Sequence, residues 1–246
     1  MPELLNNAAL ERSEVAANSL DKLVLVACHA VYTGDAGGDP YNDSNWLLQD
    51  FQQGETPFYI EHICLGIEIA GVQPDSLLVF SGGQTRREAG PRSEAQGYWL
   101  IAQHFGWRGR PDVCSRATTE EFARDSFENL LFGLCRFYET VGRNPESIEV
   151  VSWAFKQRRF DMHRDAINWP ASKYSFFGVN NPVDLEAATK GEEKAIADFA
   201  ADPLGAGESL RKKRAFRDPF NRRRPYCASC PHLAGPLGCR SGQSAN

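Results

Sequence analysis

An apolar strand is predicted to end inside the stretch Val79-Phe80-Ser81-Gly82-Gly83-Gln84-Thr85-Arg86. Residues 76–80 are mostly apolar, whereas the residues after them carry hydroxyl, amide and guanidinium groups. A buried strand that stops in paired glycines and anion-binding side chains is typical of the ligand-binding edge of an α/β sheet. Glycine there permits a positive φ and lets a ligand approach the bare backbone. The alternative is an ordinary strand-to-helix turn with solvated arginines.

Strands and helices alternate along the rest of the chain. Strands are predicted at residues 22–28, 76–80, 112–117, 148–153 and 174–179. Helices are predicted at residues 57–70, 93–105, 156–167 and 184–199, with a helical turn at 46–51. One more helix begins at Thr118 or at Asp125 and ends near Gly142. Such alternation predicts parallel strands joined by right-handed crossovers, and therefore an α/β three-layer sandwich with a mostly parallel sheet of about five strands.

Length and composition predict one large domain with short additions at both ends. The chain has 246 residues, of which 42% are hydrophobic. We expect an N-terminal helix within residues 1–21, a domain at 22–182, and a C-terminal helix with a basic tail at 183–246 that packs on the domain. No apolar run is long enough to cross a membrane, and the N-terminus lacks a secretory pattern. Cys28, Cys64 and Cys135 lie in apolar stretches, as thiols of a cytoplasmic protein do.

Charge is distributed unevenly. Residues 211–246 contain nine basic residues and one acidic residue, whereas the rest of the chain contains 18 basic and 31 acidic residues. The basic tail could bind nucleic acid, anionic lipid or an import receptor, or it could pack on the acidic body or close over an anionic ligand. Aromatic residues and prolines interrupt the charges and favour the intramolecular or ligand role. The acidic body makes nucleic acid an unlikely partner.

Polar groups follow four of the predicted strands. Because the carboxyl ends of parallel strands meet at one edge of a sheet, we expect these groups to share one pocket. The candidates for proton transfer are His29, Glu94 and His163. The candidates for ligand binding are Ser81, Gly82, Gly83, Gln84, Thr85, Arg86, Ser93, Ser126, Glu128, Asn129 and Arg159.

Each candidate also has a plainer interpretation. His29 could be a core histidine, and Asn129 could only hold a loop. Glu94 could bind a ribose-like hydroxyl, act as a base, ligate a metal, or merely favour the first turn of its helix. Of the cations after the fourth strand, Arg159 is preferred because it shares a helical face with His163.

Four potential zinc ligands lie in the tail: Cys227, Cys230, His232 and Cys239. The spacing from Cys230 to His232 is tight for zinc, so a tail that packs as a loop is favoured and no metal is assigned. Phosphate-binding loops of the Walker type, a complete G-x-G-x-x-G after the first strand and a nucleophile elbow are all missing from the sequence.

Four short motifs carry a resemblance to a known family: Ser81-Gly82-Gly83, Ser93-Glu94-Ala95, Asp125-Ser126-x-Glu128-Asn129 and Lys156-x-x-Arg159-Phe160-x-x-His163. In this order, over residues 22–180, the chain resembles the SanA/YdcF/ElyC-like family, which is defined by a domain of unknown function. The resemblance implies a Rossmann-like fold with these motifs around a polar pocket. It also implies S-adenosylmethionine as a possible ligand, since one member is reported to bind it, but it supplies no reaction.

The chain departs from that family in three places. Its first strand ends in Cys28-His29-Ala30 instead of a glycine-rich segment, it lacks the membrane anchor of many bacterial members, and its basic tail is additional. An envelope role is therefore not transferred to this protein.

Three hypotheses about function remain. The first is an enzyme, a hydrolase or transferase, acting on a small anionic, nucleotide-like or phosphorylated substrate: Arg86 and Arg159 would hold its charge, the amides of Gly82 and Gly83 would stabilise an oxyanion or phosphate, and a histidine with Glu94 would move protons. The second is a non-catalytic module that binds S-adenosylmethionine or a nucleotide. The third is an interaction protein that uses its basic tail.

Overall fold

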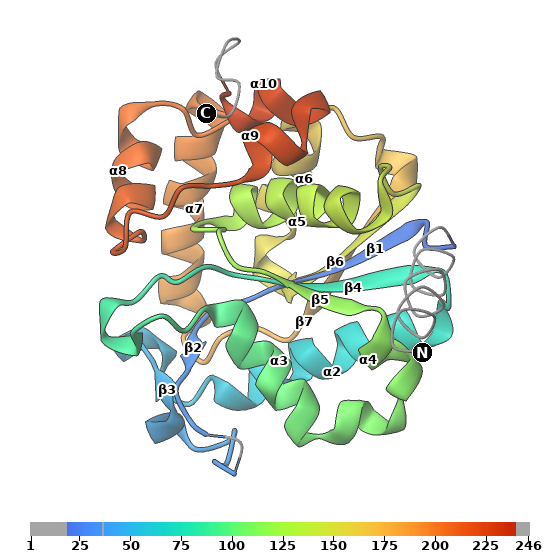
Figure 1. Ribbon diagram of the computed structural model, residues 1–246. Helices are drawn as coiled ribbons and strands as arrows, with labels where there is room; N and C mark the ends of the chain where they lie inside the picture. Colours follow the sequence, from blue (N-terminus) through green and yellow to red (C-terminus); the bar gives the residue numbers. More distant parts are fainter. Residues whose placement is uncertain (1–18, 36, 240–246) are drawn as a thin grey trace.

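A single sheet of five parallel strands lies between two layers of helices (Figure 1). The computed structural model describes residues 19–35 and 37–239. In spatial order the strands are β5 (Ala117–Glu120), β4 (Ser76–Ser81), β1 (Lys22–Ala27), β6 (Ser147–Trp153) and β7 (Tyr174–Val179). All four neighbouring pairs are parallel. The predicted α/β fold with a parallel sheet is therefore confirmed, and it is Rossmann-like.

The helices divide between the two faces of the sheet and the C-terminal segment. One face is covered by α2 (Thr56–Val72), α3 (Glu94–His104) and the short α4 (Pro111–Ser115), and the other by α5 (Ser126–Val141) and α6 (Gln157–Ala166) (Figure 1). The C-terminal segment contains α7 (Leu185–Ala201), α8 (Glu208–Phe216), α9 (Tyr226–Ser229) and α10 (Ala234–Leu237). Among the described residues, no helix is both long enough and apolar enough to cross a membrane.

Alternate residues of each central strand enter opposite cores, as the pleat of a strand requires. Val24 and Val26 of β1 pack toward α2 and α3, whereas Leu23 and Leu25 pack toward α5 and α6. All four side chains are buried. Burial on both faces explains why the strand reads as a continuous apolar run in the sequence.

The strand order creates a crevice at the carboxyl edge of the sheet. From β1 the chain moves outward through β4 to β5, then crosses to β6 and β7 on the other side of β1. The loops after β1 and β6 therefore depart in opposite directions. Parallel sheets bind their ligands at such a reversal of strand order.

Two predicted elements are wrong, and the structure decides between the two predicted starts of a third. Residues 111–115 form a helix that Pro111 begins, and the strand follows at 117–120. The helical turn predicted at 46–51 is replaced by β3 (Trp46–Leu47), which pairs with β2 (Val31–Tyr32), and a 3-10 turn at 50–52. The buried indole of Trp46, which donates to the Pro40 carbonyl, fixes that strand pair. Asp125 caps α5, which excludes the start at Thr118. The predicted N-terminal helix lies almost entirely outside the described residues.

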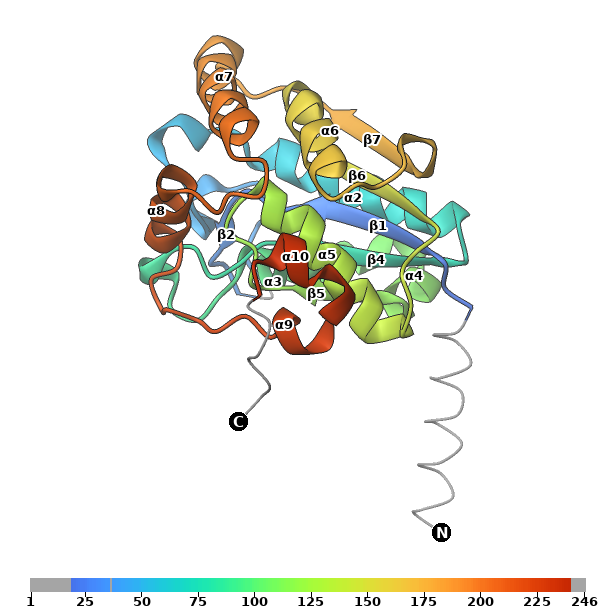
Figure 2. The ribbon, with the colours of Figure 1, turned by 90° about the horizontal axis from the view of Figure 1, so that it is seen from above.

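The C-terminal segment packs on the domain. In Figure 2, α7 lies beside α6, α9 and α10 lie against α5, and α8 lies beyond the carboxyl ends of the strands. Phe199 of α7, Leu210 of α8 and Tyr226 of α9 share one apolar cluster with Phe127 and its neighbours on α5. The basic tail is thus part of the folded body.

The tail cysteines and histidine have partners other than zinc. Cys227 and Cys239 form a disulfide. Cys230 is buried and its thiol donates to the Cys135 carbonyl, while His232 contacts Asn144. Within residues 19–35 and 37–239, no group of three or more histidine, cysteine or acidic side chains is placed to hold a metal ion.

We expect the Cys227–Cys239 disulfide to stabilise the packed tail. It closes a loop with a sequence separation of 12 residues, for which chain-entropy estimates give about 3 kcal/mol. Cys227→Ser should lower the free energy of unfolding, measured in urea, by about that amount. The parent protein in reductant should have the same free energy of unfolding as the variant. Cys114→Ser, at a partly buried free thiol, is the control. Equal stability of Cys227→Ser and the parent would show that the bond does not hold the tail.

Candidate functional site

A cavity of about 430 Å³ lies at the carboxyl edge of the sheet. Its walls come from the loops after β1, β4 and β6, the first turns of α3 and α5, and from α7 and α8. A second, more open hollow of about 520 Å³ runs along α3 and the edge strand β5, away from the crevice. Because the strand order reverses beside the first cavity, that cavity is the candidate site.

Half of the predicted site residues line this cavity. They are His29, Thr85, Arg86, Glu94, Ser126, Asn129 and Arg159. The others lie behind its wall, and most have partners within the protein. These are Ser81, Gly82, Gly83, Gln84, Ser93, Glu128 and His163.

The paired glycines position Glu94 instead of binding a ligand. The amide of Gly82 donates to the Glu120 carbonyl and that of Gly83 to the Ala123 carbonyl, so neither is free to stabilise an oxyanion or phosphate as predicted. Their carbonyls accept from the first two amides of α3. A Cβ on Gly82 would lie 2.7 Å from the Cβ of Glu94. Glycine is thus required here because α3 begins in direct contact with the strand end.

Other predicted ligand-binding residues stabilise this turn. Ser93 is buried and caps α3 by accepting from the amide of Gln96. The amide of the Gln84 side chain donates to the Pro91 carbonyl. Both residues therefore hold the loop that carries Thr85 and Arg86 along the cavity.

Ser81 lies one layer below the cavity in a buried hydrogen-bond network. Its hydroxyl lies 2.7 Å from a carboxylate oxygen of Glu120 and 3.2 Å from the side-chain oxygen of Asn129. Tyr226 of the tail also donates to Glu120. Burial raises the pKa of Glu120 to about 7, although these hydrogen bonds oppose the shift. This network connects the tail to Asn129 in the cavity wall.

Glu94 is a candidate acid or base of the cavity. Burial raises the pKa of its carboxyl group, while the Thr85 hydroxyl, which donates at 2.6 Å, and nearby arginines oppose that shift. A carboxyl group whose pKa is raised can exchange protons closer to neutral pH than an ordinary glutamate.

Four cations line the cavity without a carboxylate partner. They are Arg86 after β4, Lys156 after β6, and Lys213 and Arg217 from the α8 region of the tail. Across the described part of the chain, none of the four forms an ion pair within 4.0 Å. The guanidinium group of Arg217 donates to the Arg124 carbonyl at 3.0 Å. The sequence indicated the basic tail, but its alignment with this cavity depends on the fold.

Lys156 and His29 meet in the wall of the cavity. The amine of Lys156 lies 3.4 Å from Nδ1 of His29. Burial, and then the charge of Lys156, hold the pKa of His29 well below its usual range, so the ring is neutral at neutral pH. Burial also lowers the pKa of Lys156 to about 7. Sequence reasoning set Lys156 aside in favour of Arg159, which is paired with Glu192 of α7 at 2.8 Å.

Ser126 and His163 lie as close together as a nucleophile and its general base, but the surroundings of the histidine ring do not suit a base. The Ser126 hydroxyl lies 2.8 Å from Nε2 of His163. The ring is buried against Phe127 and Phe199, and burial lowers its pKa to about 3. Its Nδ1 has no partner among the described residues that would orient it. His163 is therefore a buried support for Ser126, and we do not retain it as the general acid or base.

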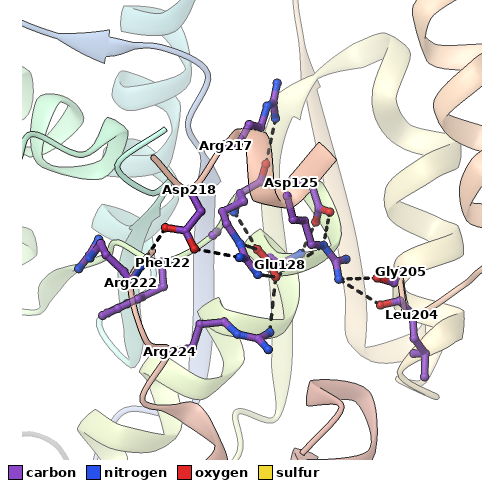
Figure 3. Close-up of polar contacts among 12 residues, drawn as sticks. Phe122, Asp125, Glu128, Leu204, Gly205, Arg217, Asp218, Arg222 and Arg224 are labelled. Carbon is purple, nitrogen blue, oxygen red and sulfur yellow. Dashed lines mark hydrogen bonds and ion pairs between the residues drawn. The ribbon is translucent and has the colours of Figure 1, made fainter. Parts of the chain in front are cut away.

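Glu128 holds the tail and does not face the cavity. In Figure 3 its carboxylate is surrounded by arginines from the loop before α5 and from the tail. Arg124 contacts it at 2.6 Å, Arg224 at 3.5 Å and Arg214 at 3.5 Å. Arg214 also pairs with the buried Asp125 at 2.6 Å. This network fixes α8 beside the cavity.

Part of the cavity wall is apolar. It contains Phe51, Trp153, Phe155, Pro182 and Ala187, and Phe51 is 65% exposed. The cavity thus combines unpaired cations with an apolar surface suited to a flat or nonpolar group.

The chain is similar to a known protein, but that protein has no assigned activity. The chain is 27% identical over 262 residues to the uncharacterized protein YOR238W of Saccharomyces cerevisiae, and the alignment covers 83% of this chain and 86% of the yeast protein. No family model and no solved structure matches the chain. The resemblance to the SanA/YdcF/ElyC-like family stays a prediction.

We expect Arg214→Ala to release the tail from the domain. The variant leaves Asp125 buried without its cation, and removal of one partner of a buried ion pair costs about 3–5 kcal/mol. Urea unfolding monitored by tryptophan fluorescence measures the loss. Arg211→Ala, at an exposed position on the same helix, should leave stability unchanged. A loss below about 1 kcal/mol for Arg214→Ala, the scale of a surface pair, would contradict this account.

Stability should fall in acid because His163 resists protonation in the folded state. Its folded pKa is about 3, and the unfolded value is about 6.5. The unfolded state therefore binds the extra proton, and stability falls as pH drops from about 6.5 toward 3, by at most about 1.4 kcal/mol per pH unit from this group. His62, with a pKa of about 4, acts in the same direction.

Urea unfolding of His163→Gln and its parent between pH 4 and 7.5 isolates this contribution. Glu120 has the opposite effect. Because its pKa is raised in the folded state, its contribution to the free energy of unfolding is lost as pH rises from about 4.5 to 7. The difference between variant and parent at each pH removes that contribution. The exposed His104→Gln is the control. Equal slopes for His163→Gln and the parent would show that His163 does not resist protonation.

Proposed function

We propose that the protein is an enzyme whose cavity binds a small phosphorylated or nucleotide-like molecule and catalyses its hydrolysis or group transfer. The observation that carries this proposal is the set of cations Arg86, Lys156, Lys213 and Arg217, which line one cavity and form no ion pair with a carboxylate of the described residues. Partly buried cations without an ion-pair partner are costly, and an anionic ligand would offset that cost.

The amino end of α5 adds to the attraction for anions. Its first turn reaches the cavity at Ser126. The amino end of a helix carries partial positive charge and favours phosphate or carboxylate groups. Arg217 and Lys213 would hold the anion, the apolar wall would contact the rest of the ligand, and Glu94 would transfer a proton.

A second candidate is a non-catalytic module that binds S-adenosylmethionine or a nucleotide. The apolar wall with Phe51, Trp153 and Phe155 favours a ligand with a flat heterocycle. The four cations favour a nucleotide over S-adenosylmethionine, whose sulfonium group is itself positive.

The third hypothesis, binding through the basic tail, has less support. Arg214, Arg222 and Arg224 contact the domain, so their charges are largely engaged within the protein.

A cytoplasmic location remains part of our proposal because Cys28 and Cys135 are buried free thiols. In that compartment the Cys227–Cys239 disulfide would be open to reduction.

Binding should depend on Arg217, at the junction of tail and cavity. A thermal-shift screen with inorganic pyrophosphate, nucleotides, sugar phosphates and S-adenosylmethionine identifies a stabilising ligand. Loss of one charge-assisted hydrogen bond costs about 1.5–3 kcal/mol, so Arg217→Ala should weaken binding about 10- to 100-fold by calorimetry. Arg211→Ala, exposed on the same helix, should bind as the parent does.

The enzyme and the binding-module hypotheses predict different results for the Glu94→Gln variant. For an enzyme, this variant should bind the ligand found in the screen but convert it at least about 100-fold more slowly, the usual contribution of an acid or base. For a binding module, neither protein forms a product. No phosphorylated ligand for the parent, or unchanged affinity in Arg217→Ala, would refute the proposed site.

A further inference from the structure

Lys156 occupies a chemically distinct position in the cavity wall. It follows β6 in a 3-10 turn at residues 154–156, partly buried, with its amine 5.6 Å from the ring centre of Phe155. Among the residues that the structure describes, its amine makes one polar contact, with Nδ1 of His29 at 3.4 Å. In the part of the chain that the structure describes, no carboxylate lies within 4.0 Å of it. A neutral imidazole is a weak partner for an ammonium ion, and its unprotonated nitrogen accepts a hydrogen bond from a neutral amine as well as from an ammonium.

The charges that face this amine come from every neighbouring element. Arg159 of α6 and Arg217 of the tail lower its pKa, while Glu192 of α7 and Glu55 before α2 raise it. Burial is the largest influence, and the resulting pKa is about 7. The neutral form of the amine is therefore accessible near neutral pH. Burial and an adjacent cation are the two ways in which proteins make lysine nucleophilic.

The remaining cations are available to hold an anionic group beside that amine. Arg217 lies close enough to lower the pKa of both Lys156 and His29 by its charge, and it counteracts the raised pKa of Glu94. Lys213 lies close to Arg217. A ligand whose phosphate contacts Arg217 and Lys213 would thus extend toward Lys156 and Glu94.

We propose that Lys156 is a nucleophile that captures the carbonyl group of a phosphorylated aldehyde or ketone as an imine. The inference deepens the proposed anion site and rests on it. The neutral amine adds to the carbonyl carbon, and the carbonyl oxygen leaves as water with the two amine hydrogens, so that a C=N bond replaces C=O. Glu94, in its protonated form, donates a proton to the departing hydroxyl group and then takes the second amine hydrogen from the nitrogen, so that its own proton is regained.

A nucleophilic role for Lys156 differs from the role of a lysine that only binds an anion. A lysine that only binds phosphate remains charged and gains nothing from a neighbouring imidazole. A lysine that attacks a carbonyl must lose its proton, and burial together with the charges of Arg159 and Arg217 favours that state. Sodium borohydride reduces an imine to a stable secondary amine, so the step can be tested before the natural substrate is known.

The test uses pyridoxal 5′-phosphate as the probe, because it is an aldehyde with a phosphate. The full chain is incubated with a limiting amount at pH 7, reduced with borohydride, and mapped by peptide mass spectrometry. At this pH a lysine with a pKa of about 7 has a neutral fraction about 1000-fold larger than a lysine with the usual value of about 10.4. Allowing for the weaker nucleophilicity of a less basic amine, the adduct on Lys156 should exceed that on the exposed Lys190 by at least about tenfold.

Matched variants make the assignment specific. Lys156→Arg keeps the charge and should lose the adduct with no shift to Lys213, the other lysine of the cavity; an unchanged melting temperature verifies its fold. Lys190→Arg should label as the parent does. Labelling of Lys156 should rise through about pH 7. Labelling spread evenly over the lysines, or concentrated on Lys213, would overturn the inference.

Two further measurements separate this inference from the proposed function. Pyridoxal, which lacks the phosphate, should label Lys156 at least about tenfold less, the effect of 1.4 kcal/mol from phosphate contacts. Pyrophosphate binding, followed by calorimetry without borohydride, tests the anion site alone. Binding without an adduct on Lys156 would refute the nucleophile and leave the anion site. Absence of binding, with pyridoxal and its phosphate equally reactive, would refute the anion site and with it the phosphorylated substrate.

Discussion

The buried pair between Asp125 and Arg214 is the contact on which the candidate site depends. Asp125 caps α5 and so belongs to the domain, whereas Arg214 lies on α8 and belongs to the tail. Because a buried charge without a partner costs several kcal/mol, the two segments are stable only together. Their association places Arg217 at the cavity and brings the acidic body against the basic tail (Figure 3). The charge asymmetry of the sequence is thus resolved within one molecule.

Much of the fold could be predicted because its signals are local. The apolar run of β1, the capping box at Ser93 and the glycine after α5 each act within a few residues. The errors have local causes as well. The strand predicted at 112–117 was displaced because Pro111 begins a helix, a preference that the apolar pattern does not contain. The pairing of β2 with β3 depends on where the Trp46 indole is buried, which is a tertiary property.

The site was predictable as a location but less so in its chemistry. Parallel strands bring their ends together, so residues such as Glu94 and Asn129 do line the cavity. Whether a polar group is free to bind a ligand depends on partners distant in sequence. The amide of Gly82 donates to Glu120 at the end of β5, and that of Gly83 donates to Ala123 in the loop after it. Arg217 lies outside the predicted domain, and its position in the cavity follows from the tail packing.

The contrast between His163 and Lys156 shows how burial decides chemical roles. Both are basic groups near the same cavity, and burial lowers the pKa of each. For an imidazole the shift moves the group away from neutral pH and leaves a weak base that fills space beside Phe199. For an amine the same effect moves the group toward neutral pH and makes it reactive. A sequence in which both residues follow one strand cannot separate these outcomes, because the difference comes from the starting pKa and the neighbours that the fold supplies.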